Sequence, residues 1–392
     1  MPPASPVTPD FLNAEWPLLL EACAVPGGSA RIHDLTARFA KSKSESLLTL
    51  AEKHGVLAQL TKGFGGNSAA PMPPTFSESL LARRRVQLVS ALGLTAELFR
   101  FLELLGQAQV EAVTVKGPAL AFRAYGDSTA RSYGDIDLVI RHADIGRAVK
   151  AAISAGYQSR ISIEAIRQQK VPGQYVFVRP ETHALIELHT ERTLRYFPRP
   201  VPVEKFLQRK VSLLLDRHAV PALAAEDEFV LVSIHGAKHF WERLMWISDI
   251  AALVRNCPEL DWKRVRESAS EVGAERMVNV ALLLAKHLLR APVPEAMKRD
   301  VTEDLAGARL VRDIESWLPY GGYAPPQILQ RAKFRYQMRG QLFAGAAYLS
   351  RLSFSTTEED WSENSEAPGS RVSEIIRRPL RLAKKHRRDS NS

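Results

Sequence analysis

The segment 134–140 reads Gly-Asp-Ile-Asp-Leu-Val-Ile, in which acidic and aliphatic side chains alternate before an aliphatic end. Successive side chains of a β-strand point to opposite faces of the sheet, so this pattern predicts a half-buried strand over 135–140. Ile136 and Leu138 would enter a core, while Asp135 and Asp137 would project together from the other face. Because adjacent carboxylates repel each other unless a cation lies between them, this strand constrains both fold and chemistry.

A divalent cation is the natural partner of such an aspartate pair. Magnesium prefers oxygen ligands and commonly binds one or two carboxylates together with the phosphates of a substrate. Phosphoryl transfer uses that arrangement to neutralise charge on the transferred group. Paired acids also occur on solvated strands, so the pair indicates a metal site only in combination with its flanking segments.

Two segments near the aspartate strand strengthen the case for phosphate chemistry. Residues 115–120, Val-Lys-Gly-Pro-Ala-Leu, predict a turn from a strand into a helix, where Gly117 permits a close approach of the backbone. The N–H groups at such a helix N-terminus can bind phosphate. Residues 186–189, Ile-Glu-Leu-His, predict another alternating strand, which offers Glu187 as a third acid.

The residues around these segments predict an α+β core. Strands are predicted over residues 110–115, 135–140, 174–179 and 184–189, and helices over 117–125 and 145–155. A small mixed sheet of about four or five strands is therefore expected.

Helical periodicity dominates on both sides of this core. The clearest helices are predicted over residues 11–24, 30–41, 44–60, 77–107, 227–255, 262–272 and 276–289. The chain therefore divides into an N-terminal helical region (1–107), an α/β core (108–200), a C-terminal helical region (220–352) and a polar, basic tail (353–392) that is predicted to be disordered.

The predicted helix over 227–255 carries an unusual polar stripe. At about 100° per residue, six side chains would share an arc of roughly 100°. They are His235, Lys238, His239, Glu242, Trp246 and Asp249. Such a face suits the wall of a nucleotide or acceptor pocket, and the alternative is a solvent-facing amphipathic stripe. The two histidines have zinc-ligand spacing, but Gly236 stands where a metalloprotease motif needs glutamate.

The succession of short motifs resembles a known family. It comprises Lys-Gly at 116–117, Tyr-Gly-Asp at 125–127, Arg131, Gly-Asp-Ile-Asp-Leu-Val at 134–139 and Ile-Glu-Leu-His at 186–189. This succession resembles the uncharacterised bacterial nucleotidyltransferase family of the polymerase-β-like superfamily. That family continues with a His-Gly-Ala-Lys-His…Trp…Asp pattern, which residues 235–249 match. The resemblance covers approximately residues 80–290.

The resemblance implies a role for each matching residue. Asp135 and Asp137 would bind catalytic Mg²⁺ (or Mn²⁺), and Glu187 would be the third catalytic and metal-binding carboxylate, which orients or deprotonates the incoming hydroxyl. Residues implied in nucleotide binding are Lys116, Gly117, Arg131, Gly134, Lys238 and His239. Because acids that share a metal are strongly coupled, the Glu187 carboxyl is expected within about 6 Å of Asp135 or Asp137.

The sequence departs from the pattern of the superfamily in two ways. Pro118 follows Gly117 where the superfamily has serine, so a hydroxyl ligand for phosphate is missing, and the stretch from this turn to Asp135 is longer than usual. His189 is interpreted as a structural histidine of the sheet and not as a site residue.

The predicted function is transfer of a nucleoside monophosphate from a nucleoside triphosphate to an acceptor, with release of pyrophosphate. The acceptor is a small molecule, a peptide or RNA. One alternative is a catalytically inactive nucleotide-binding or regulatory protein of the same fold. Another is an RNA-modifying, toxin-like transferase, which the basic tail suggests.

Charge and composition bear on partners and location. The formal net charge is +10, which suits an anionic partner. Part of it gathers near the C-terminus in Arg377, Arg378, Arg381, Lys384, Lys385, Arg387 and Arg388. This run is interpreted as a solvated tail, with contact to RNA or a membrane surface as the alternative. The absence of a transmembrane run and of a secretory signal, together with only two cysteines, indicates a reducing cytoplasm.

Overall fold

The computed structural model describes residues 14–24, 35–40, 42–65, 72–159, 173–190, 201–321 and 328–340, together with Ile166 and Arg199. The tail predicted over 353–392 lies outside the described residues. Within the described part, no helix has both the length and the apolar character needed to cross a membrane.

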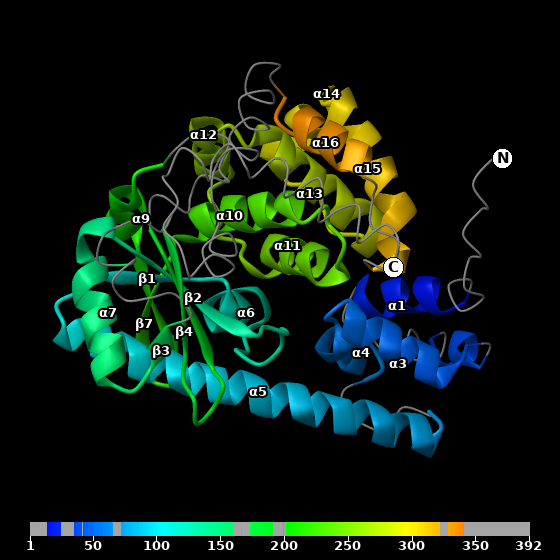
Figure 1. Cartoon of the computed structure of the whole chain (residues 1–392). Helices are drawn as coiled ribbons and strands as arrows, with labels where there is room; N and C mark the ends of the chain where they lie inside the picture. The colour runs from blue at the N-terminus through cyan, green and yellow to red at the C-terminus, as the bar shows by residue number, and fades with distance from the viewer. Residues whose placement is uncertain are drawn as a thin grey trace.

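A single mixed sheet organises the described strands, in the order β3-β4-β5-β2-β1-β7-β6. The strands are β1 (Ala112–Val115), β2 (Asp135–Ile140), β3 (Gln158–Ser159), β4 (Gln174–Val178), β5 (Leu185–His189), β6 (Val211–Leu215) and β7 (His218–Ala222). β2 lies at the centre, antiparallel to β1 and parallel to β5. The predicted α+β class is confirmed (Figure 1).

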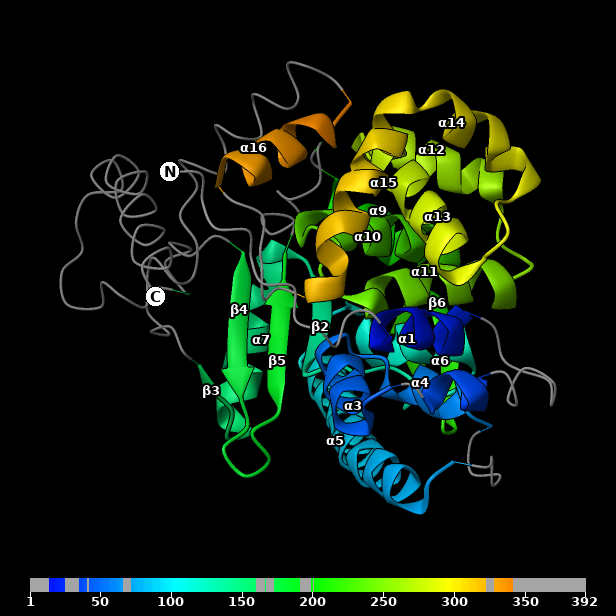
Figure 2. The ribbon, with the colours of Figure 1, turned by 90° about the vertical axis from the view of Figure 1, so that its right-hand side faces the viewer.

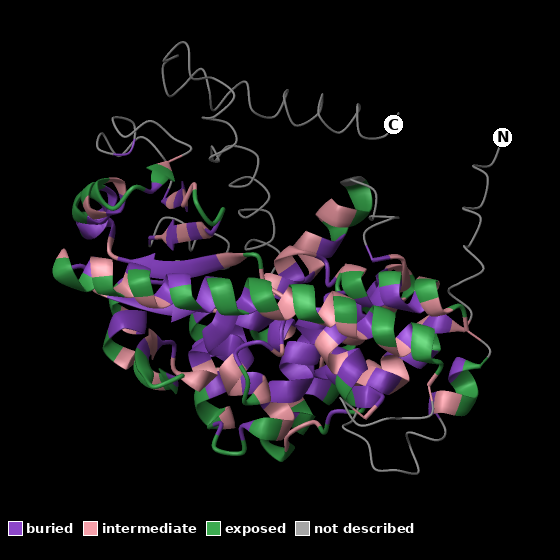
Figure 3. Ribbon diagram, turned by 90° about the horizontal axis from the view of Figure 1, so that it is seen from below, coloured by how far each residue is buried: buried purple, intermediate pink, exposed green. Residues whose placement is uncertain are grey.

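One face of the sheet is covered by α5 (Pro74–Gln107) and α7 (Ile145–Ser154). Ile136, Leu138 and Ile140 of β2 are fully buried in a core with these helices. The outer side of α5 faces away from the sheet and carries exposed residues (Figure 3). The aliphatic half of the β2 pattern therefore packs as predicted.

On the opposite face, α6 (Gly117–Tyr125) packs on β1 and β2, α11 (Leu244–Asn256) packs on α6, and α10 (Ala225–Lys238) packs on α11, whereas β4 and β5 lie to one side of these helices (Figure 2). α6 follows β1 directly, packs on α11 and ends at Gly126, whose φ of 73° suits glycine in a left-handed cap. Because Asp135, Asp137 and Glu187 belong to this side of the sheet, these helices border the candidate site.

The remaining helices enlarge the core on the α10–α11 side. They are α1 (Glu15–Ala24), α3 (Ser44–Lys53), α4 (Leu57–Gly63), α9 (Val203–Arg209), α12 (Trp262–Val272), α13 (Glu275–Leu289), α14 (Lys298–Glu303), α15 (Leu305–Trp317) and α16 (Ile328–Gln337). α1 packs on α13 as well as on α3 and α4. N-terminal and C-terminal helices therefore share one hydrophobic core.

The sheet is larger than the sequence predicted. β6 and β7 form an antiparallel hairpin at the end of the sheet beside β1, so it has seven described strands and not four or five. β6 is an edge strand whose Val211 and Leu214 are exposed, and this apolar exposure hides the alternation that a half-buried strand shows.

The prediction of one continuous helix over 44–60 is also wrong. The chain forms α3 and α4 with a break at His54–Gly55, where Gly55 has φ of 69°. Such a backbone angle ends an α-helix, and glycine adopts it without strain.

A second break divides the helix predicted over 227–255. α10 ends at Lys238, and Phe240 and Trp241 then adopt φ of 56° and 53°, which non-glycine residues rarely do. The Trp241 ring packs directly against Gly236, where an added Cβ would lie 2.5 Å from ring carbons. The predicted six-residue stripe therefore does not lie on one helix.

Candidate active site

The turn from β1 into α6 places a lysine beside the aspartate strand. Lys116 has φ of 55° and ψ of −138°, a sparsely populated conformation that costs of order 1–3 kcal/mol, and Gly117 follows with φ of 47°. The Lys116 side chain contacts Asp137, with Nζ 2.9 Å from Oδ2. A strained turn that presents a charged side chain is typical of a functional site.

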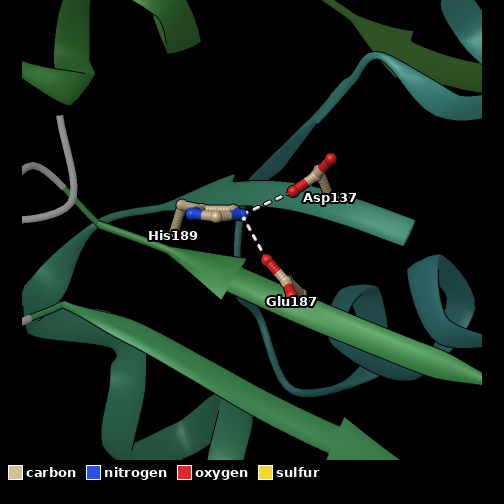
Figure 4. Close-up of side chains that lie close together, drawn as sticks. All are labelled: Asp137, Glu187 and His189. Carbon is tan, nitrogen blue, oxygen red and sulfur yellow. Dashed lines mark hydrogen bonds and ion pairs between the residues drawn. The ribbon is translucent and has the colours of Figure 1, made fainter. Parts of the chain in front are cut away.

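Three potential metal ligands lie side by side on β2 and β5. The register pairs Asp137 with Glu187, and His189 follows two residues later on the same face of β5. His189 Nε2 lies 2.6 Å from Asp137 Oδ1 and 3.5 Å from Glu187 Oε2 (Figure 4). The ligand atoms of these three residues all lie within 4.8 Å of one another. The expected proximity of Glu187 to an aspartate of β2 is therefore present.

A neighbouring strand supports the third carboxylate. Gln174 of β4 donates a hydrogen bond from Nε2 to Glu187 Oε2 over 2.8 Å. β4 pairs antiparallel with β5, so Gln174 lies opposite His189 in the register. The site thus draws polar side chains from three adjacent strands, whose backbone hydrogen bonds fix their spacing.

The charges of Asp137 and His189 depend on each other. Burial opposes ionisation of Asp137, but the Lys116 ammonium and His189 hold the pKa of this carboxyl well below its usual range. Burial likewise opposes protonation of His189, and hydrogen bonding to Asp137 and Glu187 nevertheless raises the pKa of the imidazole. The ionised Asp137 carboxylate therefore lies between the Lys116 ammonium and the His189 imidazole.

Asp135 occupies a different electrostatic environment. It is half-buried, and its pKa is raised by burial and then by the charge of Asp137. Its carboxylate does not belong to the group of ligand atoms within 4.8 Å. The two aspartates of β2 therefore share a face, but Asp137 lies closer to the other potential ligands.

The C-terminal end of α10 contributes a cluster of rings. The ring centroids of His235 and His239 lie 4.7 Å apart, and each lies 5.4 Å from that of Trp246 of α11. Burial lowers the pKa of His239 to about 3, and the charges of Lys238 and Lys116 act in the same direction. Both histidines are neutral at pH 7, because burial and nearby positive charge also lower the pKa of His235.

Arg131 and Gly134 lie in the segment that leads into β2. Arg131 is buried and donates from Nε to Asp249 Oδ2 over 2.8 Å, while Tyr125 donates to Asp249 Oδ1. Gly134 is exposed. The structure thus gives Arg131 a partner on α11, and its contact with phosphate stays a prediction.

Sequence reasoning did not assign His189 and Gln174 to the site. His189 stands two residues after Glu187, so the strand period that placed Glu187 beside Asp137 also places the imidazole there. The two-residue period of a strand could therefore have identified His189 as a site residue from the sequence. Gln174 enters through the β4–β5 pairing, which no local pattern specifies.

The donor set of this site suits a divalent cation. Asp137 and Glu187 supply carboxylate oxygens and His189 supplies an imidazole nitrogen, at separations that one ion can bridge with small movements. Asp137 is buried, so a cation there would be well shielded from solvent.

Among the comparisons with known proteins, the match to a family model supports a nucleotidyltransferase assignment. No curated protein matches the chain. One similar solved structure is the crystal structure of an antigenic nucleotidyltransferase-like protein from Paracoccidioides brasiliensis; it is 16% identical, covers 53% of this chain and 93% of that chain, and has a TM-score of 0.29. The family model described as uncharacterised nucleotidyltransferase matches residues 40–290, which is more than half of the chain. The chain therefore belongs to this family of uncharacterised nucleotidyltransferases.

Proposed function

We propose that the protein transfers a nucleoside monophosphate from a nucleoside triphosphate to an acceptor hydroxyl and releases pyrophosphate. The observation that carries the proposal is the in-register pairing of Asp137 with Glu187 beside the β1–α6 turn. It sets two carboxylates next to a lysine and a helix N-terminus, the combination that a metal-bound triphosphate requires. Membership of the family supports the same activity, and we place the chain in the polymerase-β-like superfamily.

Asp135, Asp137 and Glu187 are the proposed metal-binding residues, with Mg²⁺ or Mn²⁺ as the cofactor. When bound, such ions neutralise charge on the triphosphate and on the leaving pyrophosphate. The half-buried position of Asp135 at the start of β2, next to Asp137, supports its inclusion. Burial and then the charge of Asp137 raise the pKa of Asp135, and a metal shared by three carboxylates would relieve the repulsion between the two aspartates.

The transfer exchanges one phosphorus–oxygen bond for another. The acceptor oxygen bonds to the α-phosphorus while the bond from that phosphorus to the bridging oxygen of the β-phosphate breaks, so pyrophosphate leaves with the electron pair. Glu187 orients the acceptor hydroxyl and takes its proton. Lys116 and the N-terminus of α6 hold the phosphates, and the protein's share of catalysis is positioning and charge stabilisation.

Helix α10 forms the second wall of the proposed substrate site. The charges of Lys116 and Asp137 both act on His235, which places this helix end close to β2. Lys238 and His239 continue the same helix end, and we propose that they contact the nucleotide. A neutral imidazole at His239 can both donate and accept a hydrogen bond, as recognition of a base or sugar requires.

A direct labelling experiment tests the proposal. The purified protein is incubated with each α-³²P-labelled nucleoside triphosphate, Mg²⁺ or Mn²⁺, and a cell extract divided into small-molecule, RNA and protein fractions. We expect label from at least one nucleotide to appear in one acceptor fraction, and an Asp137→Asn protein to leave that fraction unlabelled. Nucleotide binding without labelling of any fraction would instead support the inactive, regulatory alternative.

The basic tail requires a separate arm of the same experiment. Removal of the residues after Ser370 should leave labelling of a small acceptor unchanged. If labelling appears in RNA and disappears with the tail, the RNA-modifying alternative replaces the small-acceptor interpretation.

A further inference from the structure

An imidazole lies among the ligand atoms of the proposed metal site. We propose that His189 binds the metal directly through Nε2, and that the site therefore prefers Mn²⁺ and related first-row cations to Mg²⁺. The inference rests on the proposed function and goes beyond it by adding a ligand and by choosing between metals. It starts from the three side chains drawn in Figure 4.

The spacing of the three ligand atoms suits one ion. With metal–ligand distances of about 2.1 Å, neighbouring ligands lie about 3.0 Å apart and opposite ligands about 4.2 Å apart. The observed separations from His189 Nε2 are 2.6 Å to Asp137 Oδ1 and 3.5 Å to Glu187 Oε2, and no pair in the group exceeds 4.8 Å. Movements of about half an ångström bring both His189 separations to the roughly 3.0 Å of neighbouring ligands, and one ion bridges Asp137 and Glu187 once their oxygens lie within about 4.2 Å of each other.

The contacts of Asp137 leave one carboxylate oxygen, Oδ1, facing His189 and available to a metal ion. Lys116 contacts Oδ2, whereas Oδ1 faces the imidazole. The carboxylate is therefore held from its far side, and the oxygen that faces the cluster can take up an ion without breaking the lysine contact. The position of Asp137 in the middle of β2, between β1 and β5, restricts any larger movement.

The position of His189 is equally restricted. It lies on β5 opposite Val139, two residues beyond Glu187, and β5 is paired on both sides by β2 and β4. Residues two apart on a strand share a face, so the nitrogen and the Glu187 oxygen approach the Asp137 oxygen from one neighbouring strand. A ligand set built on paired strands is already in place before an ion binds.

The nitrogen ligand determines the metal preference. Mg²⁺ takes oxygen ligands in a rigid octahedron, and all-oxygen carboxylate sites satisfy it. Imidazole nitrogen binds later first-row divalent metals better, and affinity at a given site rises from Mn²⁺ to a maximum at Cu²⁺. Mn²⁺ combines tolerance for imidazole with a preference for carboxylate oxygen, so it is the metal that two carboxylates and one histidine fit.

His189 could instead only position Asp137, and a suitable variant distinguishes this positioning role from direct binding of the metal. As a positioning residue, His189 would only donate a hydrogen bond to Asp137 and would never touch the metal. His189→Gln keeps a side-chain N–H donor of similar reach but removes the imidazole. A positioning role predicts an unchanged ratio of Mn²⁺ to Mg²⁺ affinity in this variant, whereas a ligand role predicts that the ratio falls.

Titration calorimetry of the full chain with Mg²⁺ and Mn²⁺, without nucleotide, gives both affinities directly. We expect the wild-type protein to bind Mn²⁺ at least roughly tenfold more tightly than Mg²⁺, and His189→Gln to lose roughly ten- to a hundredfold in Mn²⁺ affinity with a smaller loss for Mg²⁺. The exposed His287 of α13 supplies the matched control, because His287→Gln should change neither affinity.

Electron spin-echo envelope modulation of the Mn²⁺-loaded protein detects the bond itself. The wild-type protein should show coupling of Mn²⁺ to imidazole nitrogen that changes on ¹⁵N-histidine labelling and is absent from His189→Gln. Circular dichroism must show that this variant is folded.

The outcomes separate the inference from the proposed function. Mn²⁺ bound without nitrogen coupling, or an unchanged affinity ratio in folded His189→Gln, would overturn the inference and leave the carboxylate site standing. Absence of binding of either metal to wild-type protein, also with a non-hydrolysable triphosphate present, would overturn both.

Discussion

Arg131 and Asp249 form a buried ion pair, in which Arg131 Nε lies 2.8 Å from Asp249 Oδ2 and the Asp249 side chain has no exposed surface. Tyr125 donates a hydrogen bond to the other carboxylate oxygen. The pair joins the segment before β2 to α11, so it fixes the entry of the aspartate strand against the helices that cover its face. Removing one partner of such a pair leaves the charge of the other partner buried and unpaired.

Arg131→Met should lower the free energy of unfolding by about 3–5 kcal/mol, because Asp249 would be left buried without its partner. Arg131→Met combined with Asp249→Leu should recover part of this loss. Urea unfolding of the single and double variants measures both effects, and strictly additive losses would contradict the pairing. ATP titration of the folded single variant tests, independently, the predicted contact of Arg131 with phosphate.

Gly236→Ala should destabilise the break between α10 and α11. The new Cβ would lie 2.5 Å from the ring of fully buried Trp241, and a clash of this kind costs roughly 1–3 kcal/mol. Gly93→Ala in α5 is the matched control, since nothing lies within 4 Å of its new Cβ. It should stabilise the protein by about 0.5–1 kcal/mol through helix propensity. Equal melting temperatures for the two variants would refute the close Trp241 contact.

The elements around the candidate site show which features could be predicted from the sequence and which could not. β2 and α6 were predicted with the bounds that the structure has, because strand alternation and the turn at Gly117 are local signals. The proximity of Glu187 to the aspartates of β2 was expected from the family resemblance and not from spacing, since Glu187 lies 50 residues after Asp137.

The helix break after Lys238 was not predicted, because its cause is a specific packing contact between residues five apart, which helical periodicity does not report. Residues 227–255 have continuous helical periodicity, and the left-handed turn at Phe240 and Trp241 depends on the packing of the Trp241 ring against Gly236. The predicted stripe is therefore only partly present. His235, His239 and Trp246 lie close together, although they come from two helices, whereas Asp249 forms an ion pair with Arg131.

Asp137→Asn should reduce nucleotidyl transfer by roughly a hundredfold or more, because a neutral amide binds a divalent cation far more weakly than a carboxylate. The measurement is the initial rate of labelled product formation, with metal affinity from calorimetry. Asp144→Asn is the comparison, since Asp144 is also a buried aspartate but lies beyond the end of β2. Loss of activity in both variants would point to a general effect of removing buried charge.

Buried His54 should make stability depend on pH. Burial lowers its pKa from 6.5 to about 4, and its Nδ1 accepts a hydrogen bond from the Leu244 backbone N–H. Between pH 6.5 and 4 the unfolded chain binds a proton that the folded protein does not, so the free energy of unfolding falls as the pH falls. The contribution of His54 over this range is about 3 kcal/mol.

His54→Asn removes the titration while keeping an acceptor near the position of Nδ1. Urea unfolding at intervals from pH 7 to pH 4 should show a shallower decline for this variant than for the wild-type protein. His235 and His239 also have lowered pKa values and add to the decline in both proteins, so the difference between the two curves isolates His54. Parallel curves would show that His54 titrates normally.

The contact of α1 with α13 has a consequence for synthesis of the chain. Glu21 of α1 pairs with Arg290 at the end of α13, 269 residues later, and the two helices pack together in the shared core. On the ribosome, α1 can pack on α3 and α4 soon after it is made, but the part of its surface that faces α13 stays uncovered until α13 has emerged. Native packing around α1 is therefore completed only late in translation, and during that interval this apolar part of α1 is transiently exposed, as aggregation-prone surfaces are.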